Sequence, residues 1–563
     1  MKKAIVALLA LAASCKSIAM DHDVEAQQWC RNVVMGWNLG NSLEASGSET
    51  EWRNPLTTKE MIHTVKSEGF NAIRIPVRWG QHCDMTTMDI DATWLARVKE
   101  VVGWCLDEDM MVVINTHHDT WLEHYPTLAK KEELNTKLRK LWTNIANAFK
   151  DYDGRLAFAG TNEINPEGNW DLTPTQENHD VQNSFNQTFV DDVRATGGNN
   201  LKRNLIVQTF RCNPGLGLSH FTVPTDPTER RLSVEFHYYD PYSYCSGKPE
   251  SYYYWGFAYA DKGTVTPDGN ELSLATQFKQ IRKAWWEQGL GVVMGEHGCS
   301  HHYTTNDRDT QEANQQYFMK CLVGEARKNG FAAFAWDNNC FGNGSEQFGI
   351  FRRSGSTATV SASYYLEGIR QGSKENYVES VDYDNEDPDT GIGGEVLWEG
   401  EKELNWDEGL QLHIDKSKFT SFSGSATIVC YYRQDATATY ESIQLNDNNW
   451  KPFSCTVSTP VVTASCNGDF SPRNFYGTSG ATHITPFAVS GSVLTKLKSS
   501  GAKIQGYGVV MTKVVIIDKP STSVSMPTLS TSSSGRTFDL RGVEVKSPRK
   551  GNVYIVDGKQ KVF

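Results

Sequence analysis

Short apolar runs alternate with longer stretches of helical spacing over residues 33–369. Such runs are typical of strands buried on both faces, and the stretches between them predict amphipathic helices. One helix is expected from the N-cap Thr57 to Gly69, with Glu60 completing its capping box, and another from Thr93. The expected strands lie within VVMGWNLG (33–40), NAIRIPV (71–77), MMVVINTHHD (110–119), RLAFAGTNE (155–163), NLIVQTF (204–210), RLSVEFHYY (231–239), GVVMGEHG (291–298) and FAAFAWDNN (331–339).

Strands that alternate with helices in this way predict an α/β fold, a closed (β/α)8 TIM barrel. An open doubly wound sheet would gather its polar residues at one switch point, whereas here they recur at nearly every strand end. Because the carboxyl ends of barrel strands meet on one face, we expect these residues to share a site. They are Asn38, Arg74, His117, His118, Asn162, Glu163, His237, Tyr239, Glu296 and Trp336.

Two of these strand-end residues are glutamates, Glu163 and Glu296. A pair of carboxylates is the minimum equipment for cleaving a glycosidic bond, one as acid and one as nucleophile or base. Taken singly, the other residues have structural alternatives: Arg74 as an ion-pair partner, His117 as a core histidine and Trp336 as packing. Gathered on one rim with two carboxylates, they favour a catalytic site.

The amino-acid composition limits the classes of molecule that the protein is expected to bind. Lys+Arg 55 against Asp+Glu 67 gives a net charge of -12, which argues against nucleic acid and leaves neutral polymers open. The 12 cysteines show neither CxxC nor Cys/His ligand spacing, so no zinc site is inferred and no disulfide can be assigned. No metal or organic cofactor is expected, and the protein is expected to be a monomer.

The amino-terminal segment is typical of an export signal. Lys2 and Lys3 precede an apolar run, and a small-residue cleavage site ends at Ala19, so residues 1–19 are excluded from the fold. Cys15 keeps a lipoprotein anchor open as a second choice. No other stretch is long and apolar enough to span a membrane. The mature protein is therefore expected to be secreted or held at the cell surface.

The carboxyl-terminal third has a different character. An acidic run from Glu375 indicates a linker over 375–393, and short Thr-, Val- and Tyr-rich runs without helical period predict a β-sandwich over 394–520. Trp398, Trp406 and Trp450 are interpreted either as a sugar-binding platform or as core residues. Residues 521–563 combine a Ser/Thr-rich linker with a β tail, which we interpret as a sorting element or a structural hairpin.

Several motifs in one order resemble glycoside hydrolase family 5, with most likeness to its subfamily 4 endoglucanases. They are GWNLGNSLEA from Gly36, NPLTTKEMIHTVKSEGFNAIRIPVRW from Asn54, NTHHD from Asn115, TNE from Thr161, VRATGGNN from Val193, EFHYYDPY from Glu235 and GEHG from Gly295. The resemblance covers about residues 30–370. It implies that Glu163 is the acid/base and Glu296 the nucleophile, and that most of the other strand-end residues are active-site positions. Ile164 departs from the family's usual Pro, which puts local loop geometry in question.

If the two glutamates lie about 5 Å apart, attack is direct and the configuration is retained. Glu163 must begin protonated, Arg74 and Tyr239 would keep Glu296 ionised, and Asn162 would hold the sugar 2-hydroxyl. His117 and His237 would orient these groups by hydrogen bonds. Trp336, together with Trp37 or Trp79, would stack on a sugar ring.

We therefore expect a secreted retaining endo-β-1,4-glucanase whose substrate is a β-glucan polysaccharide, with residues 20–374 as the catalytic domain. Its alternatives are an endo-acting enzyme on xyloglucan, mixed-linkage glucan (a lichenase) or mannan, or a non-catalytic surface glycan-binding protein. Every predicted catalytic residue precedes the linker. Deleting residues from about 391 onward is therefore expected to leave hydrolysis of soluble glucans largely intact.

Overall fold

The computed structural model describes most of the chain, and the predicted signal segment lies outside the described residues. The described ranges are 21–381 and 394–518, with gaps at 249–250, 260–261, 263, 267, 408, 423, 436–437, 439–440, 459–462, 467–468 and 471–482, and then 537–538, 553–556 and 559–562. The chain divides into two compact units, Met1–Lys519 and Pro520–Phe563.

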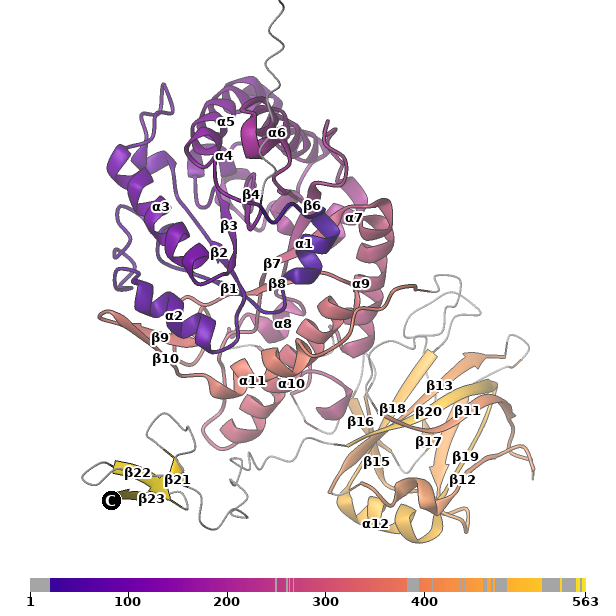
Figure 1. Cartoon of the computed structure of the whole chain (residues 1–563). Helices are drawn as coiled ribbons and strands as arrows, with labels where there is room; N and C mark the ends of the chain where they lie inside the picture. Colours follow the sequence, from indigo (N-terminus) through magenta and orange to yellow (C-terminus); the bar gives the residue numbers. More distant parts are fainter. Residues whose placement is uncertain are drawn as a thin grey trace, which may run out of the picture. The chain divides into compact units, whose positions relative to one another are not determined.

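Eight parallel strands close into a barrel in the order of the sequence, with the last strand paired to the first (Figure 1). This confirms the predicted (β/α)8 fold, and every predicted strand segment contains one of the eight. The strands are β1 (Gly36–Asn38), β2 (Ala72–Ile75), β3 (Met111–Asn115), β4 (Leu156–Ala159), β5 (Leu205–Gln208), β6 (Leu232–Tyr238), β7 (Gly291–His297) and β8 (Ala332–Ala335).

Helices before, between and after the eight strands surround the barrel (Figure 1). They are α1 (Ala26–Asn32), α2 (Lys59–Ser67), α3 (Ala92–Asp107), α4 (Thr120–Glu123), α5 (Leu128–Ala148), α6 (Gln176–Ala195), α7 (Pro214–His220), α8 (Tyr242–Cys245), α9 (Glu271–Ala284), α10 (Arg308–Lys328) and α11 (Ser363–Gly372). The predicted N-cap of α2 was wrong by one residue: the Thr58 hydroxyl, not that of Thr57, accepts from the Met61 N–H at 3.3 Å. After β8 a hairpin of β9 (Phe351–Ser354) and β10 (Thr357–Val360) precedes α11.

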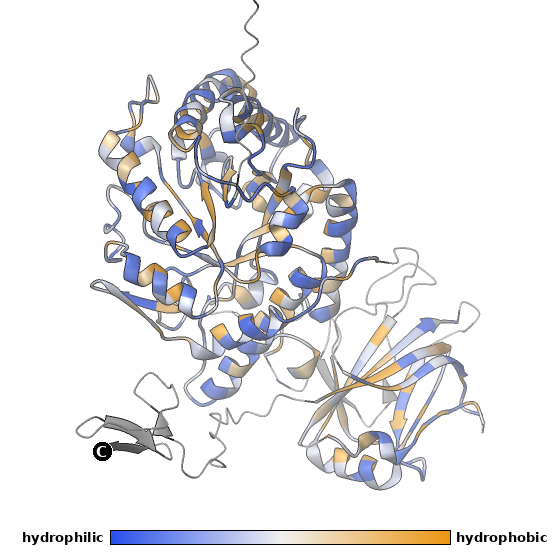
Figure 2. Cartoon of the chain, viewed as in Figure 1, coloured by the Kyte–Doolittle hydropathy of each residue, from blue (hydrophilic) through white to orange (hydrophobic). Residues whose placement is uncertain are grey.

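The barrel strands are almost wholly buried, because side chains on one face fill the barrel and those on the other meet the helices. Figure 2 shows hydrophobic residues gathered along these strands. Each buried Leu, Val or Ile side chain contributes about 1.5–3 kcal/mol to stability. Such a core can support the polar and charged side chains that follow at the strand ends.

Residues 394–518 form two antiparallel sheets around a second core, which confirms the predicted β-rich domain. The six-stranded sheet has the order β11-β20-β13-β18-β15-β16 and the four-stranded sheet the order β12-β19-β14-β17. The strands are β11 (Glu395–Leu404), β12 (Leu412–Ile414), β13 (Ala426–Gln434), β14 (Ser442–Asn446), β15 (Cys455–Ser458), β16 (Thr463–Cys466), β17 (Asp469–Phe470), β18 (His483–Val489), β19 (Ala502–Tyr507) and β20 (Val509–Asp518).

The expectation of no helix in this domain was wrong, because α12 (Gly491–Ser500) precedes β19. Ser490 caps it by accepting from the Val493 N–H at 3.4 Å, and Val493, Leu494 and Leu497 are buried beneath it. This helix has ten residues, of which only three are buried and apolar. It is therefore too short for a helical period to stand out in the sequence.

The three tryptophans of the β-rich domain do not share one environment. Trp398 is partly buried against the domain core, whereas Trp406 and Trp450 are 36% and 40% exposed. The Lys503 ammonium lies 3.8 Å from the ring centre of Trp450. Trp398 is therefore a core residue of this domain. Of the three tryptophans, Trp406 and Trp450 have exposed rings.

The second unit contains a small antiparallel sheet of β21 (Thr537–Phe538), β22 (Val553–Val556) and β23 (Lys559–Val562), in which β22 and β23 form a hairpin. Nine cysteines of the described ranges are free thiols: Cys30, Cys83, Cys105, Cys212, Cys245, Cys299, Cys321, Cys340 and Cys430. Within the described ranges, no helix has the length and apolarity that a membrane crossing requires.

Candidate active site

A β-bulge at the carboxyl end of β7 positions Glu296. Phe236 of β6 pairs with Met294, but the next residue, His237, pairs with Glu296, so Gly295 is one extra residue in β7. The register against β8 shifts over the same stretch. Bulges re-aim side chains next to active sites. Here the bulge brings the Glu296 carboxylate beside His237.

Only glycine fits at position 295, because the bulge leaves no space for a side chain there. A Cβ atom on Gly295 would lie 1.8 Å from Oε1 of Glu235. The Gly295 carbonyl, which the bulge turns away from regular pairing, accepts from Nδ2 of Asn38 at 2.9 Å. Asn38 thereby ties β1 to β7, and the sequence Gly-Glu is explained by packing as well as by chemistry.

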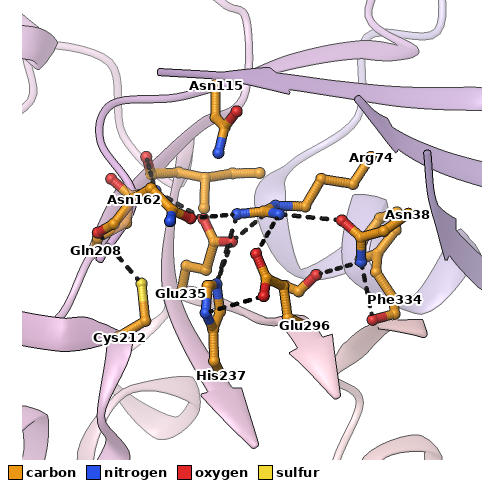
Figure 3. Close-up of polar contacts among 12 residues, drawn as sticks. Asn38, Arg74, Asn115, Asn162, Gln208, Cys212, Glu235, His237, Glu296 and Phe334 are labelled. Carbon is orange, nitrogen blue, oxygen red and sulfur yellow. Dashed lines mark hydrogen bonds and ion pairs between the residues drawn. The ribbon is translucent and has the colours of Figure 1, made fainter. Parts of the chain in front are cut away.

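Arg74 of β2 is fully buried and organises the site (Figure 3). Its Nη1 donates to Oε1 of Glu296 at 2.9 Å and to Oδ1 of Asn38 at 3.0 Å, and its Nη2 donates to Oδ1 of Asn162 at 2.9 Å. Its Nε forms an ion pair with Oε1 of Glu235 at 3.0 Å. The planar, forked guanidinium suits this set of partners, which come from β1, β6, β7 and the end of β4.

His237 connects the two predicted catalytic glutamates. Its Nδ1 lies 2.7 Å from Oε1 of Glu163 and 3.6 Å from Oε2 of Glu296. One atom from each of these three side chains lies within 4.8 Å of the others. Burial disfavours the imidazolium, but nearby negative charge, that of Glu296 included, outweighs this and raises the pKa of His237 well above its usual value.

The same three side chains are spaced so that they could hold a cation. Both oxygens of Glu296 are already engaged, Oε1 by Arg74 and Oε2 by Tyr239. The positive charge beside Glu296 is supplied by the Arg74 guanidinium and by His237, whose raised pKa favours the imidazolium. The arrangement suits the handling of a proton and a nucleophile more than the binding of a metal.

Tyr239, directly after β6, donates its hydroxyl to Oε2 of Glu296 at 3.0 Å. Burial raises the pKa of Glu296, and the charge of Glu163 adds to that rise, while His237, Arg74 and this hydroxyl oppose it. The anion of Glu296 is thus held by donors on both oxygens and oriented by them.

His117 and Trp336 form one wall of the site. Their rings are stacked with an interplanar angle of 6° and centroids 6.0 Å apart, and Trp336 is 7% exposed. Burial lowers the pKa of His117 well below its usual value, so this ring is neutral. Its two nitrogens lie within hydrogen-bonding distance of the side-chain amides of Asn115 and Asn162.

His118 has a positive φ of 55°, and its ring meets the ring of His117 edge-on with centroids 4.4 Å apart. Its backbone N–H donates to Oε1 of Glu123 at 2.9 Å, and its ring meets the ring of Trp52 edge-on. Burial lowers the pKa of His118 to about 4. His118 is therefore a neutral residue of the loop after β3.

The expectation that Trp37 or Trp79 stacks on a sugar is wrong. Both indoles are 0% exposed, and their N–H groups donate to Asp337 and to the Asn115 carbonyl. They are core residues that hold the loops after β8 and β3, and Trp336 is the ring of the three that reaches the site.

Sequence analysis missed Glu235, which is fully buried on β6. Burial would raise its pKa, but the Arg74 charge outweighs this and lowers it, and Gln208 donates to its Oε2 at 2.7 Å. The signal was available: Glu235 is two residues before His237 and so shares its strand face.

Trp170, in the loop after β4, is a second residue that sequence analysis did not select, although it is 55% exposed. The Arg211 guanidinium lies 5.3 Å from its ring centre and also donates to Oδ1 of Asn165 at 2.9 Å and to the Leu172 carbonyl at 2.8 Å. Asn165 is two residues after Glu163. The loop thus offers a fixed aromatic face close in sequence to the predicted acid/base.

A carboxylate pair at the mouth of a (β/α)8 barrel, with an arginine and a tyrosine bound to one member, defines the class of glycoside hydrolases. The family model described as cellulase (glycosyl hydrolase family 5) matches residues 38–342. The chain therefore belongs to glycoside hydrolase family 5, and the predicted enzyme class, of the endo-β-1,4-glucanase type, is confirmed.

Similar proteins of known name also support membership of glycoside hydrolase family 5. Endoglucanase B of Clostridium cellulovorans is 37% identical over 341 residues, which are 60% of this chain and 73% of that protein. Xyloglucan-specific endo-beta-1,4-glucanase BoGH5A of Bacteroides ovatus is 36% identical over 334 residues, 56% of this chain and 65% of that protein. The crystal structure of XEG5B, a GH5 xyloglucan-specific beta-1,4-glucanase from a ruminal metagenomic library in complex with XXLG, has a TM-score of 0.58, 36% identity and coverage of 64% of this chain and 100% of its own.

Proposed function

We propose that this chain cleaves internal β-1,4 bonds of glucans with retention of configuration, with Glu296 as nucleophile and Glu163 as acid/base. One observation supports the retaining mechanism: one oxygen of Glu163 and one oxygen of Glu296 lie within 4.8 Å of each other. Retaining enzymes hold their carboxyl groups about 5–5.5 Å apart, whereas inverting enzymes need about 6.5–9.5 Å for a water molecule.

In the first step the Glu296 carboxylate attacks the anomeric carbon, and Glu163 gives its proton to the departing glycosidic oxygen. A glycosyl ester of Glu296 forms as the glycosidic bond breaks. Arg74 and Tyr239 hold the attacking carboxylate in place. The His237 contact to Glu163 at 2.7 Å orients the acid.

In the second step Glu163 takes a proton from water, which attacks the same anomeric carbon from the face that the leaving group vacated. The ester bond to Glu296 breaks and the sugar leaves with its original configuration. Oδ1 of Asn162 is held by Arg74, so its amide N–H groups are presented toward the sugar 2-hydroxyl. That hydrogen bond strengthens as positive charge develops on the ring.

Aromatic surfaces supply the remaining contacts in this proposal. Trp336 faces the ring that is cleaved, and Trp170 is exposed on the loop that follows Glu163. Flat indole faces suit the C–H faces of a pyranose. Asn38 and Arg74 act through other residues, because protein groups already occupy their polar atoms.

The Tyr239 hydroxyl gives a testable pH dependence. Activity requires charged Glu296, so the rate is lost as the pH falls through the pKa of Glu296. Tyr239→Phe removes a donor that favours the charged form, so this pKa rises and the acid limb of kcat/KM moves to higher pH by about one unit. The measurement is the pH profile on an aryl cellobioside.

Tyr238→Phe is the matched control, since the neighbouring Tyr238 ring packs edge-on against Phe278. Its acid limb should coincide with that of the wild type. An unshifted limb in Tyr239→Phe would show that the hydroxyl does not tune the nucleophile.

Substrate choice is tested by products from carboxymethylcellulose, barley glucan, xyloglucan and glucomannan. We expect rapid release of oligosaccharides from the β-1,4-glucans, with new ends in the β configuration. Xyloglucan is the second candidate for the preferred substrate, because two of the proteins named above are described as xyloglucan-specific. No reducing sugar from any of the four would refute the proposal and favour a glycan-binding protein.

We also propose that the enzyme is exported and acts on polysaccharide outside the cell. The amino-terminal pattern supports this, as does the polymeric substrate class. We keep 375–393 as the proposed linker, although its first residues contact the barrel: Arg282 donates to the carbonyls of Val378 and Glu379 at 2.7 and 3.2 Å. The carboxyl-terminal β tail is proposed to be a sorting element.

A further inference from the structure

The six-stranded sheet of the β-rich domain is apolar on both faces. On β13, Ile428 and Cys430 point into the domain core, while the intervening residues point to the opposite face. An antiparallel sheet that faces water on one side alternates apolar with polar residues. Five apolar residues of this outer face, Val429, Tyr431, Ile484, Val515 and Ile517, are each at most 5% exposed.

A segment of the barrel covers this face. It belongs to the loop between β6 and α9 and contains a short 3-10 helix, Phe257–Tyr259. Tyr254, Phe257, Ala258 and Tyr259 are at most 3% exposed and form one apolar cluster with the outer sheet face. Thr427, also fully buried, donates its hydroxyl to the Phe257 carbonyl at 3.0 Å.

The same segment is fixed to the barrel on its other side. The buried carboxylate of Glu271 accepts from the Phe257 N–H at 2.9 Å and from the Tyr317 hydroxyl at 2.7 Å. Asn314 of α10 makes hydrogen bonds of 2.9 and 2.8 Å with the N–H and carbonyl of Trp255. The segment is therefore held between the barrel helices and the sheet, with its backbone groups satisfied from both sides.

The β6–α9 loop also supports the active site. It begins at Tyr239, which binds Glu296. Its Cys245 carbonyl accepts from the Ser300 N–H at 2.8 Å, and its Tyr252 carbonyl lies 2.8 Å from Nε2 of His302. Ser300 and His302 follow the nucleophile strand β7. A displacement of the loop would thus act on the strand ends that carry the nucleophile and its tyrosine donor.

We propose that the β-rich domain is a fixed brace of the catalytic barrel, and that the outer face of its six-stranded sheet is a docking surface for the β6–α9 loop. A domain that only tethers the enzyme to polysaccharide would carry a polar outer face. The proposal replaces the expectation that residues after 391 are dispensable for soluble substrates. It concerns the support of the site and is independent of which glucan is cleaved.

The test places a charge in the docking surface of the full chain. Val515→Asp introduces a carboxylate into the buried cluster, whereas Val396→Asp is the matched control, because Val396 pairs with Val515 in the same sheet and is 40% exposed. Thermal unfolding is followed by calorimetry. Kinetics use an aryl cellobioside, whose short glycone gives the β-rich domain no chain to bind.

We expect the Val396→Asp variant to match the wild type. In Val515→Asp the unfolding of the barrel should separate from that of the β-rich domain and begin at least about 3 °C lower. Its kcat/KM on the aryl cellobioside should fall at least threefold. Phe257→Asp, which changes the barrel side and leaves the β-rich domain's sequence intact, should give the same separation and the same loss.

Two results would overturn the proposal. If Val515→Asp and Phe257→Asp unfold and turn over like Val396→Asp, the contact does not brace the site. If one variant alone shows the changes, local misfolding of the altered domain explains them, and the separation of transitions is not caused by a shared surface.

Discussion

Glu296→Ala and Glu163→Ala are expected to abolish turnover of natural glucans in two chemically different ways. Without Glu296 no ester can form, so hydrolysis falls by at least about 10⁴-fold on every substrate. Without Glu163 the loss on natural glucans is about 10²–10⁴-fold, but an aryl glycoside whose leaving group needs little protonation still forms the ester. Glu60→Ala on the exposed face of α2 is the control.

Azide distinguishes the two roles. In Glu163→Ala, azide intercepts the Glu296 ester without general-base help, and two inversions give the β-glycosyl azide. In Glu296→Ala, azide attacks directly from the vacated face and gives the α-azide. NMR of the anomeric proton reads the outcome. If Glu163→Ala gave the α-azide and Glu296→Ala the β-azide, the two roles would be reversed. Full activity of either variant on glucan would exclude these carboxylates as the catalytic pair.

Arg74→Ala is expected to have the largest effect on stability. It leaves Glu235 and Glu296 buried with no guanidinium between them, and breaking a buried ion pair costs about 3–5 kcal/mol. The pKa of Glu235, which Arg74 holds down, should then rise. The free energy of unfolding from urea titration should fall by that amount at neutral pH, and kcat on an aryl cellobioside should fall at least about 10²-fold.

A double variant separates charge burial from chemistry. Arg74→Met with Glu235→Gln removes one buried carboxylate as well as the cation, so much of the lost stability should return. Activity should stay low, because Glu296 still lacks its guanidinium donor. If the double variant is no more stable than Arg74→Ala, the cost does not come from unpaired buried carboxylates.

The barrel could be predicted from sequence because its strands follow one simple rule. LAFA in β4 and GVVM in β7 are continuous apolar runs, which indicate burial on both faces, and the polar residues after them mark the strand ends. Since barrel topology brings all such ends together, the neighbourhood of Glu163 and Glu296 followed from the order of elements alone.

Contacts between layers could not be predicted in the same way. The spacing of Glu235 from His237 gives the strand face on which it lies, but its ion pair with Arg74 depends on how β2 and β6 face each other across the barrel. Trp37 lies within β1 and Trp336 directly follows β8, yet the first is sealed in the core and the second faces the site. Local sequence gives no sign of which indole face another element covers.

The docking surface is another case in which the sequence indicates burial but not which element provides it. SATIVCYY in β13 is apolar at adjacent positions, a pattern typical of a strand covered on both sides. The sequence therefore contained the sign of a second covering layer. That the layer is the β6–α9 loop of the barrel is a matter of long-range packing, because Phe257 and Thr427 are 170 positions apart.

The dispersed anchoring of Arg74 has a practical meaning for any preparation of the enzyme that contains cleaved chains. Its four partners lie on β1, just after β4, on β6 and on β7, so a cut that lets any of these segments leave removes at least one of them. A fragment cannot then retain a weakened or altered specificity. Measured turnover is consequently a direct assay of barrel integrity, and ageing preparations should lose active molecules while the survivors keep their KM.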